Sequence, residues 1–554
     1  MKTNTPLKYH VAASLLLFFS MLHPWSALAA GPLTPPGAPV PMWKTLQEVE
    51  PRTLISSVPF TISTPGSYYL SNNLTVATGD AITIAASGVT LDLNGFTLSS
   101  SAASATGYGI NINSSWKDIT ILNGHVQGGV TDNSSGIFSG PGFGGGIYGP
   151  SAANVRVSGV SVSGVLYDGI YLNASGSTVV EECTVNTAGS YGIDAVVVER
   201  CSAFNCGYYG IVANQVSDST GQAQASSGGG VYAISAINCY GISSGNGYGL
   251  SALNNAENCY GYASTGFYGL IAITANNCYG TTGNTNGYGI NASDANGCYG
   301  YGGYAGVYAI GTAHGCYGYS YYGYGVYAYA ANNCYGYSSY YGATSYAGVN
   351  ASVANNCYGY SYNYYSGSYN NYGVQAKAAN NCYGSASYGY GVYVQPGTAE
   401  NCYGTSTYDY GIYAKTANNC YGYSANSYGM FANAANNCYG ESYSSDGLDA
   451  GVANNCYGTT STGSYGLYCQ AANNCYGYIG GTGSGGYGLY AFTANNCYGY
   501  NYHSSGYGLY SNIAIGCYGY EAGSSGIGIS AYIANSCYGA GTTPQSITYK
   551  YNMP

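Results

Sequence analysis

The stretch ANNCYGYSANSYGMFANAANNCYGE, Ala417–Glu441, holds two copies of Asn-Asn-Cys-Tyr-Gly that begin 18 residues apart. The triplet Cys-Tyr-Gly occurs sixteen times between Cys239 and Cys537, at intervals of 18 to 25 residues. A second marker, Tyr-Gly followed by an aliphatic residue, stands between many successive triplets, as at Tyr428-Gly429-Met430. Repeats of this period are typical of solenoids, in which each repeat packs on its neighbours.

The two halves of the repeat differ in how much their length varies. From the Tyr-Gly marker to the next Cys is nearly always 10 residues, whereas the distance from Cys to the next marker ranges from about 8 to 15. One arc of each coil is therefore constant and the other tolerates insertions. This pattern predicts coils that stack through a constant wall and bulge on one side.

The repeat predicts strands and not helices. Gly and Asn recur every few residues, and both are poor helix formers. Aliphatic residues and Ala fall on one parity and Tyr on the other, which is the alternation of a strand. We therefore expect Cys, Gly, Ala and the aliphatic residues inside the coil and Tyr outside.

The residue before each triplet Cys indicates a sharp corner. It is Asn or Gly in every copy except one, Ser536. Asn and Gly adopt positive φ at the lowest cost, so a left-handed residue is expected here. Stacked Asn side chains are also expected to pass amide hydrogen bonds from coil to coil.

The residues before the triplets show the same plan with larger core residues. GIYLNASGSTVVEECTVNTAGSYGIDAVVVERCSAFN (Gly169–Asn205) and GDAITIAASGVTLDLNGFTL (Gly79–Leu98) resemble the right-handed parallel β-helix repeat of the pectin-lyase-like superfamily. The resemblance covers roughly residues 59–540 and implies an all-β, right-handed parallel β-helix (solenoid). Counting the repeats from about Thr61 predicts roughly 22 short coils, with an internal Cys ladder. The triplet coils are shorter and smaller-cored than the enzymes of that superfamily usually show. The fold alone does not decide function, since it carries lyases, hydrolases, adhesins and proteins without known activity.

Five segments are expected along the chain. Residues 1–29 form a signal peptide, with Lys2 and Lys8 at the charged start, an apolar stretch and the small-x-small site Ala27-Leu28-Ala29. A Pro-rich leader and N-terminal cap region follows over 30–58, then coils with a Val/Ile/Leu core over 59–206. The triplet repeats occupy 207–540, and 541–554 form a C-terminal tail. We expect a secreted or cell-surface (extracellular or periplasmic) protein without a transmembrane segment.

Charge excludes some classes of partner. Only 5% of the residues are charged and the net charge is −10. Beyond residue 201 the basic residues are Lys377, Lys415 and Lys550. Without a basic patch, neither nucleic acid nor an anionic membrane surface is an expected partner.

The chain has 20 cysteines. Side chains stacked about 4.8 Å apart do not suit a disulfide, whose Cβ atoms lie about 3.8 Å apart. A column of buried thiols is therefore favoured, with strained pairs between neighbouring coils as the alternative. Cys206 and Cys469 are off the triplet ladder, and we expect them to be open to solvent. No Cys-x-x-Cys occurs and the His residues are scattered, so neither a metal site nor a cofactor is predicted.

Candidate catalytic carboxylates are few. Superfamily members that resemble lyases or polygalacturonases use clustered Asp residues, and no such cluster is present here. Alignment of the early coils stacks Glu181 under Glu199, and two carboxylates about 5 Å apart could serve a retaining glycosidase. The alternative is that both occupy the solvated turn that Asn-Asn fills later. Asp168 and Asp194 differ in phase and are not expected to converge.

The insertions are the stronger functional lead. YSYNYYSGSYNNYG (360–373) enters at the variable arc and consists of Tyr, Ser, Gly and Asn, the composition of adaptable binding loops. Its tyrosine rings could stack on sugar faces. The alternative is that Tyr covers the rod, packed ring on ring. The candidate binding residues are Tyr362, Tyr364, Tyr365 and Tyr369.

These observations favour a secreted, non-catalytic β-solenoid with a structural, surface or adhesive role. It would bind polysaccharide or cell-surface glycan through its Tyr-rich loops. The alternative is a carbohydrate-active enzyme, a polysaccharide lyase or glycoside hydrolase, with its site in the early coils. Ice binding is disfavoured because the faces lack regular Thr ladders. An uncapped last coil near Cys537 would expose strand edges and allow end-to-end self-association.

Overall fold

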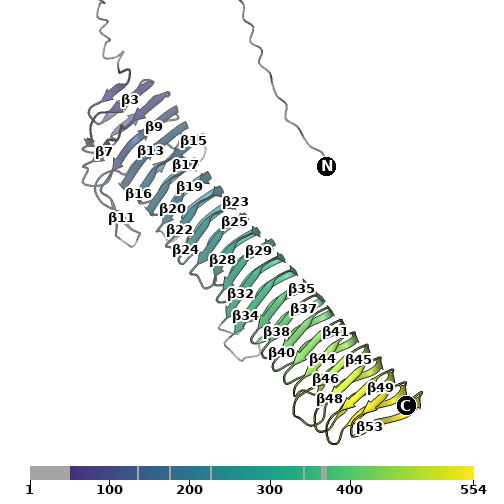
Figure 1. The fold of residues 1–554 in the computed structure, drawn as a ribbon. Coiled ribbons are helices and arrows are strands. Elements are labelled where there is room, and N and C mark those ends of the chain that lie inside the picture. Colours follow the sequence, from purple (N-terminus) through teal and green to yellow (C-terminus); the bar gives the residue numbers. More distant parts are fainter. Residues whose placement is uncertain are drawn as a thin grey trace, which may run out of the picture. The chain divides into compact units, whose positions relative to one another are not determined.

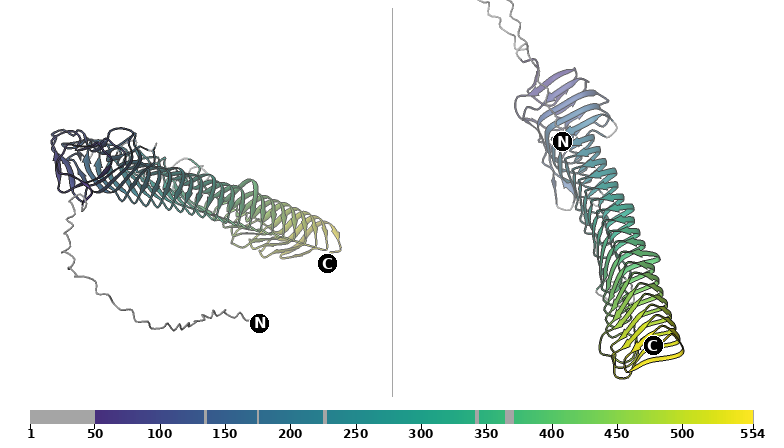
Figure 2. Two further views of the ribbon diagram at one scale, coloured as in Figure 1. Left: turned by 90° about the horizontal axis from the view of Figure 1, so that it is seen from above. Right: turned by 45° about the vertical axis from the view of Figure 1, so that its right-hand side comes forward.

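The structure is a computed structural model that describes residues 50–553, except 134–135, 174–175, 225–227, 341–343 and 364–370. The chain divides into two compact units, Met1–Pro51 and Arg52–Pro554. The first unit, including the expected signal peptide, lies almost wholly outside the described residues. The second unit is a stack of short strands, with no helix among its described residues (Figure 1). Views from two further sides show that this stack is continuous (Figure 2).

One parallel ladder of strands runs through the whole second unit and is called the long ladder. Each of its strands pairs with the strand one turn earlier, which gives about 24 turns and confirms the predicted all-β parallel β-helix. The count exceeds the expected 22 because the ladder begins at Thr53 and continues to Tyr551, within the expected C-terminal tail. The strands of the long ladder are β1 (Thr53–Ile55), β3 (Gly66–Leu70), β6 (Val89–Asp92), β9 (Lys117–Gln127), β13 (Ala153–Val165), β15 (Thr178–Glu181), β17 (Ile193–Glu199), β19 (Ile211–Ser217), β21 (Val231–Ile237), β23 (Leu250–Glu257), β25 (Tyr268–Asn276), β27 (Tyr288–Asn296), β29 (Ala305–His314), β31 (Tyr324–Asn332), β33 (Ala347–Asn355), β35 (Asn371–Asn380), β37 (Gly389–Glu400), β39 (Ile412–Asn418), β41 (Met430–Asn436), β43 (Leu448–Asn454), β45 (Tyr465–Asn473), β47 (Tyr487–Asn495), β49 (Tyr507–Ile515), β51 (Ile527–Asn535) and β53 (Thr543–Tyr551).

A second parallel ladder, the triplet ladder, carries the Cys-Tyr-Gly repeats. In the first coils β9 and β13 are long enough to join both ladders. The other strands of the triplet ladder are β4 (Leu74–Val76), β7 (Thr97–Ser100), β16 (Thr184–Ala188), β18 (Ser202–Cys206), β20 (Thr220–Ala223), β22 (Tyr240–Ser243), β24 (Tyr260–Ala263), β26 (Tyr279–Thr282), β28 (Tyr299–Gly302), β30 (Tyr317–Ser320), β32 (Tyr335–Tyr340), β34 (Tyr358–Asn363), β36 (Tyr383–Ala386), β38 (Tyr403–Ser406), β40 (Tyr421–Ser424), β42 (Tyr439–Ser442), β44 (Tyr457–Thr460), β46 (Tyr476–Ile479), β48 (Tyr498–Asn501), β50 (Tyr518–Glu521) and β52 (Tyr538–Ala540).

A third, short ladder exists only in the early coils. It merges into the long ladder at β17, whose strand bends and covers both positions. A small antiparallel pair lies in the connection that follows β9. The strands of the third ladder are β2 (Phe60–Ile62), β5 (Ile82–Ile84), β8 (Tyr108–Ile112), β12 (Gly145–Tyr148) and β14 (Ile170–Tyr171), and the antiparallel pair is β10 (Thr131–Asp132) with β11 (Phe138–Ser139).

The corner before each triplet is left-handed, as the sequence predicts. In all sixteen copies the residue before Cys has a φ between 51° and 61°, including Ser536 at 54°. The early coils turn at the equivalent place with Glu182 and Arg200, at 53° and 51°. One conformation therefore turns the chain from the long ladder to the triplet ladder, and Asn is the residue that adopts it most readily after Gly.

The predicted amide ladders are also present at this corner. Asn436 Nδ2 donates to Asn418 Oδ1 at 2.9 Å, and Asn454 donates to Asn436 at 2.8 Å. The ladder is interrupted at Asn380, whose buried Oδ1 has no hydrogen-bond partner. The residue in register above it is Glu400, whose carboxylate has no N–H to donate. An unsatisfied buried acceptor of this kind lowers the stability of the coil.

Replacing Glu400 with Asn should repair the interruption. The new amide would donate to Asn380 Oδ1 and accept from Asn418 on the next turn, and we expect the free energy of unfolding to rise by about 1–2 kcal/mol. The measurement is the thermal unfolding midpoint. Glu257→Asn is the control, because Glu257 stands above Ile237, which offers no unsatisfied side-chain acceptor. An equal gain in both variants would contradict this explanation.

The triplet cysteines form a buried column inside the coils. Each is at most 3% exposed, and all 20 cysteines of the chain are free thiols. Cys438 is representative, because its Sγ donates to the Asn436 carbonyl at 3.2 Å and to the Ala417 carbonyl of the previous turn at 3.3 Å. The thiols therefore act as small apolar fillers, as predicted, and the structure adds a weak hydrogen bond across turns.

The prediction that Cys206 and Cys469 are open to solvent is wrong. They are 0% and 1% exposed. Cys469 lies in register between Ala450 and Ala491, and Cys206 in register with Ala188, so each thiol occupies a buried alanine position. Cys206 lies in β18 of the triplet ladder and Cys469 in β45 of the long ladder, so inward positions outside the column of triplet cysteines are also buried.

The tyrosines of the triplets form one uninterrupted stack on the outer face, called the triplet stack. Its sixteen rings run from Tyr240 to Tyr538. Centroids of successive rings lie 4.3–5.5 Å apart, and their planes differ by 2–20°. Tyr therefore does cover the outer face of the coils ring on ring, which is the alternative that the sequence left open.

Candidate functional site

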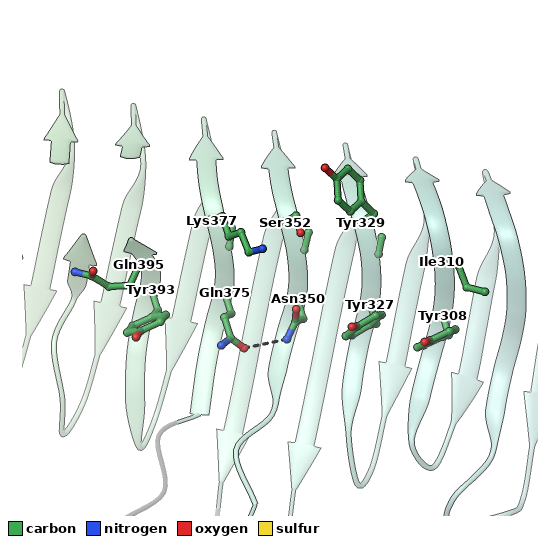
Figure 3. Close-up of a pocket in the computed structure, with 13 residues that line it drawn as sticks. Tyr308, Ile310, Tyr327, Tyr329, Asn350, Ser352, Gln375, Lys377, Tyr393 and Gln395 are labelled. Carbon is green, nitrogen blue, oxygen red and sulfur yellow. Dashed lines mark hydrogen bonds between the residues drawn. The ribbon is translucent and has the colours of Figure 1, made fainter. Parts of the chain in front are cut away.

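Two columns of outward side chains flank a groove along β29, β31, β33, β35 and β37. Figure 3 shows the two columns side by side across successive strands. The groove between them has a volume of about 430 Å³. The wall column consists of Tyr308, Tyr327, Asn350, Gln375 and Tyr393. The bend column consists of Ile310, Tyr329, Ser352, Lys377 and Gln395.

The bend in each long strand creates the groove. In β31, Val326 and Ala328 point inward and Tyr327 points outward, so the strand alternates normally up to Ala328. The register with β33 then skips Tyr329, which sits at the bend and is 65% exposed. Two outward residues therefore flank one buried Ala. Because the Ala side chain is small, the space between the two outward residues stays open and forms the groove.

The wall column changes character in the middle of the groove. Tyr308 and Tyr327 stack at 4.9 Å, and Tyr393 continues into the next stack with Tyr413 at 5.5 Å. Between these stacks stand Asn350 and Gln375, in register with the tyrosines. On two successive turns, an amide side chain thus occupies the position that an aromatic ring holds on the turns before and after.

The amide pair is ordered and still offers hydrogen-bonding capacity. Asn350 Nδ2 donates to Gln375 Oε1 at 2.9 Å (Figure 3). This leaves the Asn350 carbonyl and the Gln375 amino group able to bond a ligand. Lys377 adds an ammonium group from the bend column. Aromatic faces beside convergent amides and one cation are the groups that bind sugar rings and their hydroxyls.

Comparison with known proteins found one family model that matches the early coils. Residues 66–223 match a family described as "Right handed beta helix region". The chain is a right-handed parallel β-helix. The expected kinship with the pectin-lyase-like superfamily is consistent with this match. No curated protein and no solved structure matches the chain.

The β-helix continues beyond the matched residues without a change of plan. The long ladder passes from β19 to β21 in register, with Ile211 opposite Val231. Within the described residues no helix is long and apolar enough to cross a membrane. In the same part of the chain, no three His, Cys, Asp or Glu side chains come together as a metal site.

The candidate catalytic pair lies in the matched coils of this β-helix. Glu181 and Glu199 are in register on adjacent turns, as the alignment predicts. Arg156 Nε donates to Glu181 at 2.8 Å, and Arg200 lies 3.7 Å from Glu181 and 3.4 Å from Glu199. The Arg156 hydrogen bond lowers the pKa of Glu181. A general acid needs the opposite shift, so this environment suits an ion pair, and a catalytic role for the two residues stays a prediction.

The neighbouring Glu182 and Arg200 occupy the corner position that Asn fills in later coils. Their side chains form an ion pair of 3.3 Å across one turn, and both are exposed. Such exposed pairs contribute little to stability. The early coils thus use a charge pair where the triplet coils use an amide ladder.

Asp168 and Asp194 lie on adjacent turns and differ in phase, as the sequence predicts. Asp194 is in register with Tyr171, three residues after Asp168. Burial, with the charge of Asp168 as a second cause, raises the pKa of Asp194 to about 6. The side chain is 8% exposed and its Oδ1 has no hydrogen-bond partner. Asp168 instead accepts the backbone N–H of Tyr191, three residues before Asp194, at 3.1 Å. The expectation that the two carboxylates do not converge stays a prediction.

The predicted binding loop is described only at its start. Tyr362 lies in β34 opposite Ser339 and is 39% exposed. Tyr364, Tyr365 and Tyr369 lie outside the described residues. A binding role for these four residues stays a prediction.

The groove itself was missed in the sequence, although a signal was present. The wall column is occupied by the middle residue of a short motif, two residues before the bend. This motif is Val-Tyr-Ala in β31, Val-Asn-Ala in β33 and Val-Gln-Ala in β35. Asn350 and Gln375 are therefore adjacent substitutions in one column. Their significance depends on knowing that the column faces outward beside a bend.

Proposed function

We propose that this β-helix is a non-catalytic protein that binds polysaccharide along the groove between the wall column and the bend column. Its role would be structural, surface-forming or adhesive. The observation that carries the proposal is the replacement of two stacked tyrosines by the hydrogen-bonded amides Asn350 and Gln375 inside the groove. A fold of this kind supports a carbohydrate-related or structural role in general.

The dimensions favour an extended chain lying along the axis of the helix. Tyr327 and Tyr393 are three turns apart, which is about 14 Å at 4.8 Å per turn. A glycan laid along the groove would stack one sugar on each ring and direct hydroxyls of the sugars between them to the amides. Lys377 would bond a hydroxyl or carboxylate from the opposite side.

The proposed site of action is outside the cytoplasm. This inference rests on the sequence pattern of residues 1–29, a charged start, an apolar stretch and a small-x-small cleavage site. The lowered pKa of Glu181 gives the enzyme alternative no support.

Removing the amides should weaken glycan binding without unfolding the coils. We expect Asn350→Ala combined with Gln375→Ala to raise the Kd of the polysaccharide that the wild type retains by about ten-fold or more, since each lost hydrogen bond is worth about 1 kcal/mol. The measurement is a screen of soluble neutral, acidic and amino polysaccharides, followed by calorimetric titration of the one retained.

Tyr490→Ala is the matched control. Tyr490 belongs to the same outward column, stacked on Tyr468 at 5.2 Å and Tyr510 at 5.1 Å, but lies outside the groove. It should leave the Kd unchanged. Retention of no polysaccharide by the wild type would contradict the proposal, as would an equal loss in the control.

A further inference from the structure

One carboxylate stands beside the triplet stack where other coils carry uncharged residues. The residue after each triplet Gly is Tyr, Thr, Ser, Ile or Ala in fifteen copies and Glu in one, Glu441. Glu441 is in register with Tyr423 on the turn before and Thr459 on the turn after. Glu441 is therefore the one charged residue among the sixteen that follow the triplets.

Glu441 reaches back to a ring of the stack. The Tyr421 hydroxyl donates to Glu441 Oε2 at 2.5 Å, within the range of a charge-assisted O–H···O⁻ bond. Burial and this hydrogen bond raise the pKa of Tyr421 above its usual range. Burial and then the charge of Glu441 raise the pKa of Tyr439 to about 12. Both phenols are therefore protonated at neutral pH, and the Tyr421 hydroxyl is hydrogen-bonded to a carboxylate that can accept its proton.

The ring of Tyr421 is also in contact with its neighbours in the stack. It lies 4.7 Å from Tyr403 with planes at 10°, and 4.9 Å from Tyr439 with planes at 9°. Electronic coupling between aromatic rings falls steeply with separation, so rings in contact exchange an electron far more readily than separated ones. An electron vacancy created elsewhere in the triplet stack can therefore migrate ring by ring to Tyr421.

We propose that Tyr421 and Glu441 form a redox-active pair, at which the triplet stack holds a tyrosyl radical after one-electron oxidation. The oxidant is a one-electron acceptor such as the oxidised haem of a peroxidase. The phenol loses one electron to the oxidant, its O–H bond breaks, and the proton passes to Glu441 Oε2. The products are a neutral Tyr421 phenoxyl radical, a protonated Glu441 and the reduced oxidant.

Glu441, as the proton acceptor, explains why the radical would form at Tyr421 and not at another ring of the stack. An oxidised phenol is a strong acid, so a carboxylate already bonded to its proton lowers the barrier to oxidation. The adjacent Cys420 thiol has no comparable partner. Its Sγ donates to the carbonyls of Ala399 at 3.4 Å and Asn418 at 3.1 Å, and a carbonyl does not take up the proton. The thiol column is thus the poorer site for the radical, although it runs alongside.

The test is oxidation of the full chain by azide radical in pulse radiolysis, with the tyrosyl absorption band and electron paramagnetic resonance as readouts. Glu441→Gln keeps a carbonyl acceptor for Tyr421 but removes the base, and Tyr421→Phe keeps the ring but removes the proton. We expect each variant to lower the yield of long-lived tyrosyl radical by about ten-fold or more. The wild type should also show slower radical formation in heavy water.

Tyr279→Phe is the control, because Tyr279 stacks at 5.0 and 4.8 Å on its neighbours in the same stack, several turns from Glu441. It should leave the radical yield within about two-fold of the wild type. An unchanged yield in Glu441→Gln would overturn the proposal. So would a loss in Tyr279→Phe equal to that in Tyr421→Phe, or a loss in Tyr439→Phe with none in Tyr421→Phe. Radical signal on sulfur instead of a phenol would overturn it as well.

Discussion

Gly318→Ala is expected to lower the free energy of unfolding by about 3 kcal/mol or more, whereas Gly315→Asn in the same coil should not lower it. Gly318 is the Gly of a triplet, and a Cβ added there would lie 1.9 Å from the Gly325 carbonyl oxygen and 2.6 Å from its carbon. Both contacts are to backbone, which has no rotamer to change. The triplet ladder and the long ladder thus touch backbone to backbone, and the coil has no room for a methyl group.

Gly315 provides the contrast three residues earlier. Its φ is 59°, and an added Cβ would have no neighbour closer than 4.0 Å. Most other coils carry Asn at this corner with the same backbone conformation. Asn should therefore be accommodated and should restrict the unfolded chain slightly.

The measurement is thermal unfolding by circular dichroism, together with hydrogen exchange of β30 and β31. Solenoids unfold in parts, so the exchange data locate the loss to the altered coil. A Gly318→Ala variant as stable as the wild type would show that the two ladders are not in backbone contact.

Asp446→Asn should raise stability at pH 8 and leave it unchanged near pH 3.5. Asp446 is 9% exposed, and its Oδ1 accepts the backbone N–H of Tyr465 at 3.1 Å. Burial, with the charge of Asp449 as a smaller cause, raises its pKa from 3.8 to about 6. A carboxyl whose pKa is raised in the fold contributes most stability below its unfolded pKa and loses that contribution as the pH rises through 6.

The expected gain at pH 8 is about 2–3 kcal/mol, because one pKa unit corresponds to about 1.4 kcal/mol. Asn keeps the acceptor for Tyr465 and has no charge to bury, so the penalty disappears. The thermal midpoint of wild type and variant at the two pH values measures it. Asp294→Asn, at an exposed position with its own backbone partner, Thr312 N–H, is the control and should give no comparable gain in stability at pH 8, because no buried charge is removed. An Asp446→Asn variant that is destabilised equally at both pH values would contradict the assigned cause.

The features that the sequence predicts correctly are those set by local geometry. Parity alone places Cys438 inside and Tyr439 outside, because side chains alternate along a strand. Steric limits on φ alone identify the corner at Asn437, which has a φ of 53°. Repetition then makes each local rule visible many times, so a single exception such as Ser536 does not obscure it.

The features that the sequence does not predict depend on contacts between turns. Cys469 is buried because the residues above and below it are small, which only the register shows. Predicting the groove would require knowing both the bend that exposes Tyr329 and the register that places Asn350 beside Gln375. Each of these residues is unremarkable within its own coil.

Counting reactive thiols tests most directly whether every triplet completes one turn with its sulfur inside. Protein purified without reductant is treated with an aromatic disulfide reagent, first folded and then in denaturant. The structure predicts no reaction in the folded protein and 20 thiols per chain after unfolding. Rapid labelling of the folded protein would place the cysteines outside the coils, and fewer than 20 thiols in denaturant would mean that the column is cross-linked.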